Sequence, residues 1–186
     1  MLLKKMSKDE LLDLVNEKDE VIGEVWMSEA HNNSSIIHRE VAISVFHKRG
    51  DVLIQRRSMI KTNDPGKWVI TAAGHIGAGE NPKDAVEREL YEELGFKVDA
   101  IFYKKIFEKR VGCPGTKEAR FFWIYYSIVD KKPNFKIDKR EVIDAKWISP
   151  NKLVAFSKKN NWNINGLSHK IILEMHQKFF ERKNED

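Results

Sequence analysis

Residues 74–96 read GHIGAGENPKDAVERELYEELGF, and this stretch decides the fold. Asn81 and Pro82 start a helix, because asparagine caps helix N-termini well and proline suits the first helical position. Gly95 ends it, since glycine readily takes the left-handed conformation that follows a last helical turn. The stretch therefore predicts a helix over residues 81–94.

One side of this helix is strongly acidic. Glu89, Glu92 and Glu93 stand at positions i, i+3 and i+4, so their carboxylates share one face within a single turn. Apolar residues recur every four positions on the other side, which should face the core: Val86, Leu90 and Leu94. The acids also lie towards the C-terminal end, where the helix dipole disfavours anions. A hard divalent cation such as Mg²⁺ or Mn²⁺ would offset this charge, although most charge runs are simply solvated faces.

The overall charge divides into two parts. The chain has 186 residues, with 33 Lys or Arg against 28 Asp or Glu, a net charge of +5. Residues 80–93 hold six acidic and two basic residues, a local charge of −4, so the remainder carries +9. This surplus suits a phosphate-bearing partner but is too dispersed to indicate nucleic acid. The length predicts one domain over residues 1–186, and a single cysteine, Cys113, excludes an intramolecular disulfide framework.

The sequence carries no sign of export or of a membrane span. Its first residues lack the apolar stretch of a secretory signal. The longest apolar run, residues 121–126, has six residues, whereas a spanning helix needs roughly 20. We therefore expect a cytoplasmic protein with no membrane partner.

Strand and helix patterns alternate along the chain. Apolar alternation and turn residues predict strands over residues 11–15, 20–23, 36–46, 52–56, 68–71, 101–109, 118–129 and 142–148. Residues 25–35 are interpreted as a polar connector, and a loop with Gly112, Pro114 and Gly115 joins two of the strands. A short helix is expected from Ser149-Pro150, and a long closing helix from the four-residue spacing of Leu167, Ile171, Met175 and Phe179. The pattern predicts an α+β fold, a mixed sheet covered by helices.

The spacing within residues 74–96 resembles a known motif. Gly74, Glu80 and the run RELYEELGF at residues 88–96 match every fixed position of the Nudix box. The chain therefore resembles the Nudix hydrolases, and the similarity extends over most of residues 11–155. The resemblance implies the Nudix fold, an α/β/α sandwich around a mixed sheet. It also implies hydrolysis of a diphosphate linked to another moiety.

The resemblance also implies roles for the acids. Glu89 and Glu93 would be the chief metal ligands, Glu92 a further ligand, and Glu80 a ligand through water or an ancillary one. Arg88 would orient the glutamates by hydrogen bonds. The expected cofactor is Mg²⁺ or Mn²⁺, which would neutralise the diphosphate and activate a water molecule.

A second resemblance is narrower. Within the Nudix superfamily, the chain resembles the branch that contains isopentenyl-diphosphate isomerase. His31, His38 and His75 fall where three histidines of the isomerases help to bind metal. The alternative is that each of these histidines only makes local hydrogen bonds.

Residues outside the box complete the expected site. The general base stays open between Glu89 itself and Glu118, and a glutamate at the start of a strand is more often structural. Arg57 and Lys61 match positions that hold the diphosphate in the isomerases, and a guanidinium suits phosphate oxygens. A solvated basic turn is the other interpretation of this pair.

One departure decides between two chemistries. The isomerases need a catalytic cysteine directly before the box glycine, where this chain has Ala73. The sequence therefore favours phosphoanhydride hydrolysis over alkene isomerisation, which stays the alternative. A non-catalytic diphosphate- or RNA-binding module is a third hypothesis, and the complete glutamate set argues against it. A small-molecule diphosphate is the expected partner, with nucleoside di- or triphosphates first. The oligomeric state, including a homodimer, stays open.

Overall fold

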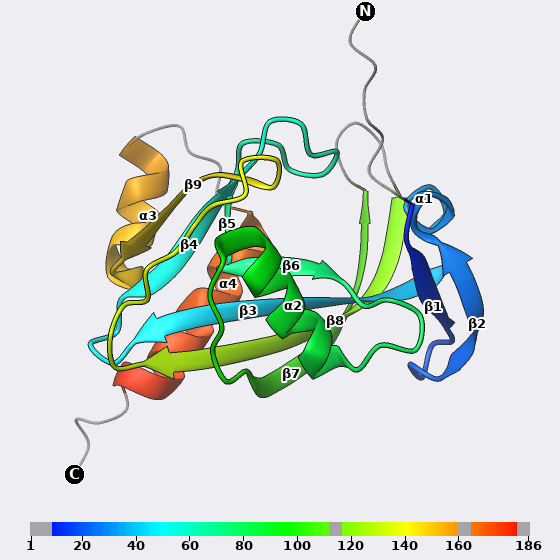
Figure 1. Cartoon of the computed structure of the whole chain (residues 1–186), viewed down its shortest axis with the longest axis horizontal. Coiled ribbons are helices and arrows are strands. Elements are labelled where there is room, and N and C mark those ends of the chain that lie inside the picture. Colours follow the sequence, from blue (N-terminus) through cyan, green and yellow to red (C-terminus); the bar gives the residue numbers. More distant parts are fainter. Residues whose placement is uncertain (1–8, 112–116, 160–164, 182–186) are drawn as a thin grey trace, which may run out of the picture.

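The computed structural model describes residues 9–111, 117–159 and 165–181. Runs of strands are separated by helices along the chain (Figure 1). The strands are β1 (Leu11–Val15), β2 (Val21–Trp26), β3 (Ile37–His47), β4 (Val52–Arg57), β5 (Trp68–Val69), β6 (Ala72–His75), β7 (Ile101–Val111), β8 (Lys117–Val129) and β9 (Val142–Ile148). The helices are α1 (Met27–Ala30), α2 (Pro82–Leu94), α3 (Pro150–Lys159) and α4 (Gly166–His176), followed by the π-helical turn η1 (Gln177–Glu181).

The strands form one mixed sheet with β3 at its centre. Its main path runs in the order β2-β1-β3-β4-β5. β8 lies parallel to β3 along its whole length, from Ile37↔Ala119 to His47↔Val129. β6 also pairs with β3, in antiparallel orientation, while β7 pairs with β8 and β9 with β4. The long strand β3 therefore pairs directly with β1, β4, β6 and β8.

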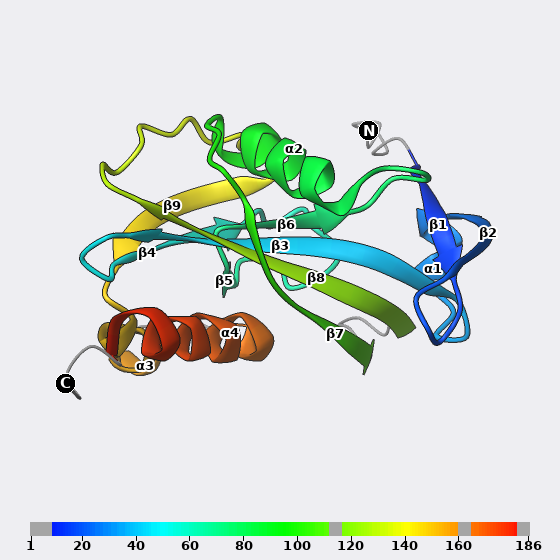
Figure 2. The same ribbon diagram turned by 90° about the horizontal axis from the view of Figure 1, so that it is seen from below.

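Helices cover both faces of the sheet. Figure 2 shows α2 on one side and α3 and α4 on the other. Along β3 the side chains alternate, so that Val41, Ile43 and Val45 pack in one cluster with the apolar face of α2. Ala42 and Phe46 point the other way and pack against α4. The predicted α/β/α sandwich around a mixed sheet is confirmed.

The decisive helix forms as its end signals predict. The Asn81 side chain accepts a hydrogen bond from the Lys83 amide, and Pro82 is the first helical residue. Gly95 adopts φ 73°, and its amide bonds to the Tyr91 carbonyl. Because these caps are local, the sequence places this helix within one residue of its observed bounds.

Three sequence interpretations need correction. Residues 25–35 are not a plain connector, because β2 extends to Trp26 and the short helix α1 follows it. The strand predicted over residues 68–71 ends at Val69 as β5, which pairs with β4, and a separate strand that was not predicted, β6, follows at Ala72–His75 and pairs with β3. The closing helix is α-helical only to His176. The loop predicted around Gly112 lies outside the described residues.

The described ranges contain no candidate for a membrane-spanning helix. None of the helices there combines the length and the apolar character that crossing a bilayer requires.

Candidate active site

The expectation that the acids lie opposite the apolar residues of α2 needs correction, because Glu93 is buried on the same side as Val86, Leu90 and Leu94, while Glu92 is exposed. The side chain of Glu93 is 3% exposed, and Glu89 is largely covered as well. Burial, offset in part by Arg88, raises the pKa of Glu89 to about 7. Burial and the negative charge of Glu89 together raise the pKa of Glu93 to about 8. Two neighbouring carboxylates that are shielded from water favour the binding of a cation or of a proton.

Gly74 makes room for one of these carboxylates. A Cβ at position 74 would lie 2.0 Å from Cδ of Glu89 and just over 2 Å from each of its oxygens. No side chain other than hydrogen fits there without displacing Glu89. The glycine at the end of β6 therefore shapes the pocket in which the Glu89 carboxylate lies.

Arg88 holds the acidic groups in place. Its guanidinium donates two hydrogen bonds to Glu80, at 2.8 and 2.9 Å, and one to Glu89 at 2.7 Å. A further bond reaches the His75 carbonyl at 3.0 Å, which ties α2 to β6. Glu92, exposed at the edge, lies 3.6 Å from the same guanidinium. Arg88 thus makes the contacts that the sequence assigns to it.

Glu80 is more constrained than a free ligand. Besides the two bonds from Arg88, its Oε2 accepts a bond from the Gly77 amide at 2.9 Å. These three donors hold the pKa of Glu80 below its usual value against the cost of its burial. Its geometry suits the ancillary role better than direct binding of an ion.

Strand β4 adds groups from the sheet. Leu53 packs with α2, and the two-residue period of a strand places Gln55 and Arg57 on the same face. Gln55 donates a 2.8 Å hydrogen bond to Oε2 of Glu93. Arg57 and Lys61 are close enough for their positive charges to act on Glu93. Sequence reasoning missed Gln55, and its position two residues before Arg57 is the signal that could have found it.

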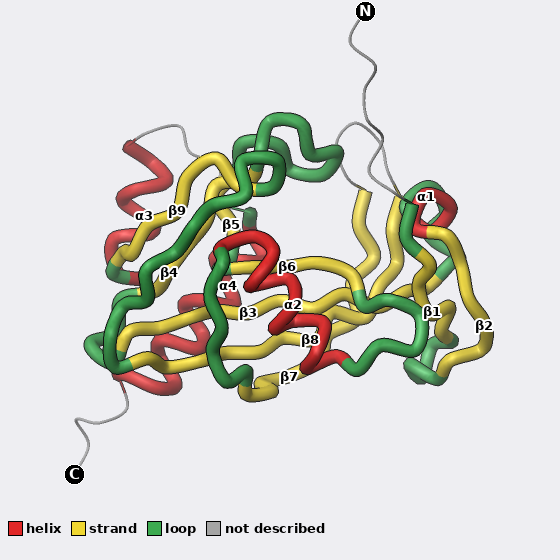
Figure 3. Tube along the Cα trace, viewed as in Figure 1, coloured by secondary structure: helices red, strands yellow, loops and turns green. Residues whose placement is uncertain are grey.

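The segment between β4 and β5, residues 58–67, is a loop (Figure 3). Lys61 in this loop forms an ion pair with Glu141, next to β9. The Arg57 guanidinium donates to the Asn63 carbonyl at 2.9 Å, which shapes the loop from inside. Both predicted phosphate-binding cations therefore lie beside the carboxylates of α2.

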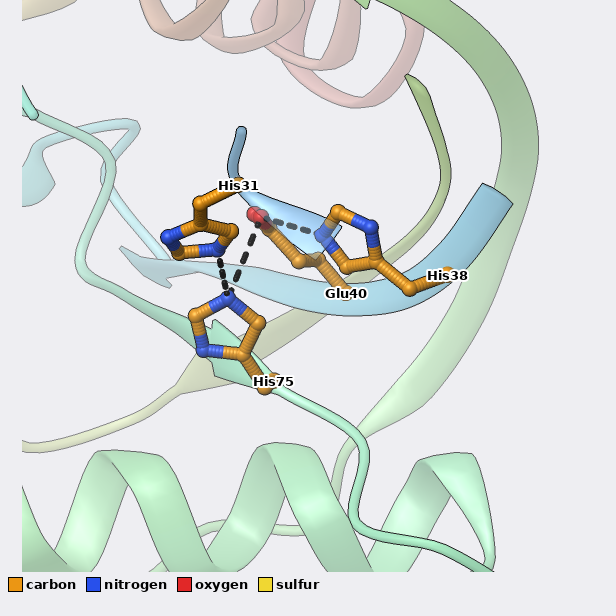
Figure 4. A group of neighbouring side chains, drawn as sticks. All are labelled: His31, His38, Glu40 and His75. Atoms are coloured by element: carbon orange, nitrogen blue, oxygen red, sulfur yellow. Dashed lines mark hydrogen bonds and ion pairs between the residues drawn. The ribbon is translucent and has the colours of Figure 1, made fainter. Parts of the chain in front are cut away.

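A second group of ligand atoms lies across the sheet from α2. Figure 4 shows His31, His38, Glu40 and His75 converging on the side of the strands away from this helix. One ligand atom from each lies within 4.8 Å of the others. The Nε2 atoms of His31 and His75 are 2.8 Å apart, and Glu40 Oε1 is 3.5 Å from Nε2 of both His38 and His75. The structure thus brings the three predicted histidines together and adds Glu40.

This histidine cluster has the character of a metal site. Burial lowers the pKa of His75 to about 3 and also lowers that of His31, so their rings stay neutral, as metal ligands must be. His38 is fully buried, and neither of its ring nitrogens has a hydrogen-bond partner among the described residues. Imidazole nitrogens with a carboxylate suit a transition metal. The donor set therefore fits a metal ion of that type.

Glu40 has a buried cationic partner. Although burial alone would raise it, the ion pair with Arg120 holds the pKa of Glu40 well below its usual range. Arg120 also binds Glu108 at 2.7 Å and lies 3.7 Å from Glu118. Sequence reasoning missed both Glu40 and Arg120, because the pairing of β3 with the distant strand β8 brings them together.

Glu118 belongs to the histidine side of the sheet. It is fully buried, accepts a 2.6 Å hydrogen bond from Asn63, and lies 3.8 Å from Nδ1 of His31. Its strand neighbour Arg120 reaches Glu40 on the same side. Ala73 also packs on this side, paired with Ala42 of β3. The two candidate bases, Glu89 and Glu118, are therefore associated with opposite faces of the sheet.

Comparison with known proteins identifies the family. The model of the NUDIX domain matches residues 37–169, and the chain belongs to the Nudix family. It is 33% identical over 181 residues to "Isopentenyl-diphosphate Delta-isomerase 2" of Photorhabdus laumondii, covering 89% of this chain and 97% of that protein. It is 31% identical over 147 residues to an uncharacterized Nudix hydrolase of Pseudomonas aeruginosa, covering 77% and 81%.

A solved structure supports the same fold. A crystal structure of a Deinococcus radiodurans protein matches with a TM-score of 0.68 at 21% identity, covering 89% of this chain and 98% of that one. The relatives therefore include both isomerase-named and hydrolase-named members of the family that the Nudix box indicates.

Proposed function

We propose that this protein is a Nudix hydrolase that cleaves a phosphoanhydride bond of a diphosphate-linked substrate with the help of Mg²⁺ or Mn²⁺. The supporting observation is the burial of Glu89 and Glu93 side by side. Within the described part of the chain, Glu93 has no ion-pair partner. Buried carboxylates are normally paired or bind metal ions, so this arrangement supports a cation at the site.

Each residue then has a defined task. Glu89 and Glu93 hold the cation from α2, and the exposed Glu92 is available as a further ligand from the same turn. When bound, the ion neutralises the diphosphate and lowers the pKa of a water molecule. Arg88 keeps Glu89 and Glu80 oriented through the hydrogen bonds described above.

Arg57 and Lys61 would bind the phosphate oxygens. Both act electrostatically on Glu93, so a phosphate group that they hold would lie beside the carboxylates. Lys61 must exchange its bond with Glu141 for one with the substrate. Such an exchange between two anions costs little, because the charge on the lysine is satisfied before and after it.

Glu89 is the preferred general base. Glu118 is engaged with Asn63 and with the histidine cluster on the other side of the sheet, whereas Glu89 lies beside Glu93. Glu89 therefore lies where its carboxylate can accept a proton from the attacking water.

A second candidate function, isopentenyl-diphosphate isomerisation, has its own support. The histidine cluster is well formed, and one of the relatives above carries the isomerase name. Ala73 opposes it, because an alanine methyl group can neither give nor take a proton at the position next to Gly74. Hydrolysis therefore remains the function that the residues support better.

A substrate screen tests the proposal. The purified protein with Mg²⁺ or Mn²⁺ is offered nucleoside di- and triphosphates, other diphosphates and isopentenyl diphosphate. We expect release of phosphate or pyrophosphate from at least one of them, and loss of this release in Glu93→Gln with the fold intact. Release that persists in Glu93→Gln would exclude the proposed site. Conversion of isopentenyl diphosphate into its allylic isomer would favour the second candidate.

A further inference from the structure

Gln55 is a buried polar residue to which the family motif gives no role. It lies on β4 between two paired strands, opposite Val69 of β5 and Ala145 of β9. Only 1% of it is exposed. A glutamine in the middle of a sheet loses its contacts with water, so its amide group needs partners within the protein.

Only half of that amide group is satisfied. Nε2 donates to Oε2 of Glu93 at 2.8 Å, whereas Oε1 is buried with no hydrogen-bond partner among the described residues. Buried polar atoms without partners are rare, and they commonly mark a place where a water or an ion binds. The unpartnered oxygen is bonded to the same carbon as the nitrogen that holds Glu93, so it lies next to the proposed metal ligand.

We propose that Gln55 is a positioning residue of the metal site. Its amide nitrogen fixes one oxygen of Glu93 and leaves the other for the cation, while its amide oxygen accepts a hydrogen bond from a water molecule in the site. This inference rests on the proposed function, because it takes Glu93 to be a metal ligand. In this role, Gln55 on β4 holds the Glu93 carboxylate from the sheet, whereas the backbone of Glu93 belongs to α2.

The neighbouring residue of the same strand provides a matched control. Ile54 is equally buried but points to the other face, where it packs with α4. Ile54→Val removes one buried methyl group, which lowers stability slightly without touching the acidic site. Gln55→Met keeps the length of the side chain and removes both the donor and the acceptor of the amide group. Gln55→Asn keeps the amide but withdraws it by one methylene.

The test measures binding of Mn²⁺ alone, by electron paramagnetic resonance and calorimetry, for these three variants and the wild type. Outer hydrogen-bond partners of metal ligands are worth about 10–100-fold in affinity. We therefore expect both Gln55 variants to bind Mn²⁺ at least about tenfold more weakly. Ile54→Val should match the wild type, and thermal melts should show that all four proteins are folded.

The alternative outcomes are distinct. If the wild type binds Mn²⁺ and both Gln55 variants bind it within twofold of the wild type, Gln55 has only a structural role. An equal loss of affinity in Ile54→Val would likewise show that the effect comes from general destabilisation. A wild-type protein that binds no Mn²⁺ would overturn the proposed function, and the role of Gln55 with it. Turnover gives a second readout: kcat should fall in both Gln55 variants, with a smaller change in KM.

Discussion

The carboxylate of Glu89 lies where a side chain at Gly74 would have to be: a Cβ added to the glycine would be only 2.0 Å from Cδ of the glutamate. The contact joins the end of β6 to the middle of α2, so a residue that looks like a turn glycine is part of the acidic site. The strand conformation there needs no positive φ, and the reason for a glycine at position 74 is therefore steric.

Gly74→Ala should remove activity while the protein stays folded. The added methyl group pushes against the flexible end of Glu89, so the carboxylate moves and the fold is kept. We expect hydrolysis to fall at least about 100-fold, the scale of a misplaced catalytic group, and Mg²⁺ to raise the melting temperature less than in the wild type.

Gly166→Ala is the matched control for that change. A Cβ at the first residue of α4 meets no atom within 4 Å. This variant should keep wild-type activity and the full effect of Mg²⁺ on melting. Gly74→Ala with normal turnover would mean that the position of Glu89 does not matter.

Arg88→Lys should impair catalysis strongly although the substitution keeps the positive charge. A lysine cannot reproduce the planar guanidinium that binds Glu80 twice and Glu89 once. We expect kcat to fall about 10–100-fold, the usual effect of losing a partner that orients metal ligands. Steady-state kinetics measures this. Arg140→Lys, which changes an exposed ion pair with Asp138, should leave kcat unaltered.

Glu93→Gln should change how the stability of the metal-free protein depends on pH. The pKa of Glu93 is about 8 in the folded protein against an ordinary value of 4.5, so the folded state binds more protons between these pH values. Its contribution to stability is therefore full below about pH 4.5 and is lost as the pH rises towards 8. The variant does not lose stability in this way. The free energies of unfolding of the two proteins should therefore diverge with pH by on the order of a few kcal/mol.

Thermal melts in a chelator between pH 5 and 9 measure that difference. As the pH rises, the melting temperature of Glu93→Gln should increase steadily relative to that of the wild type. Mg²⁺ should close the gap at high pH, because it binds the charged wild-type carboxylates. Parallel pH profiles for the two proteins would show that Glu93 is not protonated in the metal-free fold.

Lys61→Met should weaken substrate binding more than chemistry. Loss of a cation that holds the phosphate in ground state and transition state alike raises KM and leaves kcat nearly unchanged. A charge-assisted hydrogen bond is worth roughly 1.5–3 kcal/mol, so we expect KM to rise about tenfold or more. Lys83→Met, which removes an exposed ion pair with Asp99, is the control. A fall in kcat at constant KM would point to a different role for Lys61.

Local signals explain why α2 was predictable. Asn81, Pro82 and Gly95 define its ends within the chain itself, and the period of the apolar residues sets its buried face. The box spacing then identified the acids and Gly74, although only the structure gives the steric reason for the glycine. The three histidines were likewise placed by resemblance, and their convergence depends on β6 pairing with β3.

Long-range pairing explains what the sequence did not show. Arg120 meets Glu40 because β8 lies parallel to β3, with His38 opposite Arg120. No pattern near either residue encodes that register. The two-residue spacing of Gln55 and Arg57 indicates a shared face, but the meeting of Gln55 with Glu93 depends on how α2 packs over β4. Glu89 and Glu118 belong to opposite faces of the sheet because α2 packs on one face, whereas the register of β8 against β3 places Glu118 on the other.

Hydrolysis in H₂¹⁸O tests the central claim most directly. If water attacks a phosphoanhydride bond, mass spectrometry will find one ¹⁸O atom in one phosphate-bearing product, in the presence of Mg²⁺ or Mn²⁺ and not in Glu93→Gln. A product from isopentenyl diphosphate that has the mass of its substrate and carries no ¹⁸O, formed equally well by Glu93→Gln, would contradict the account.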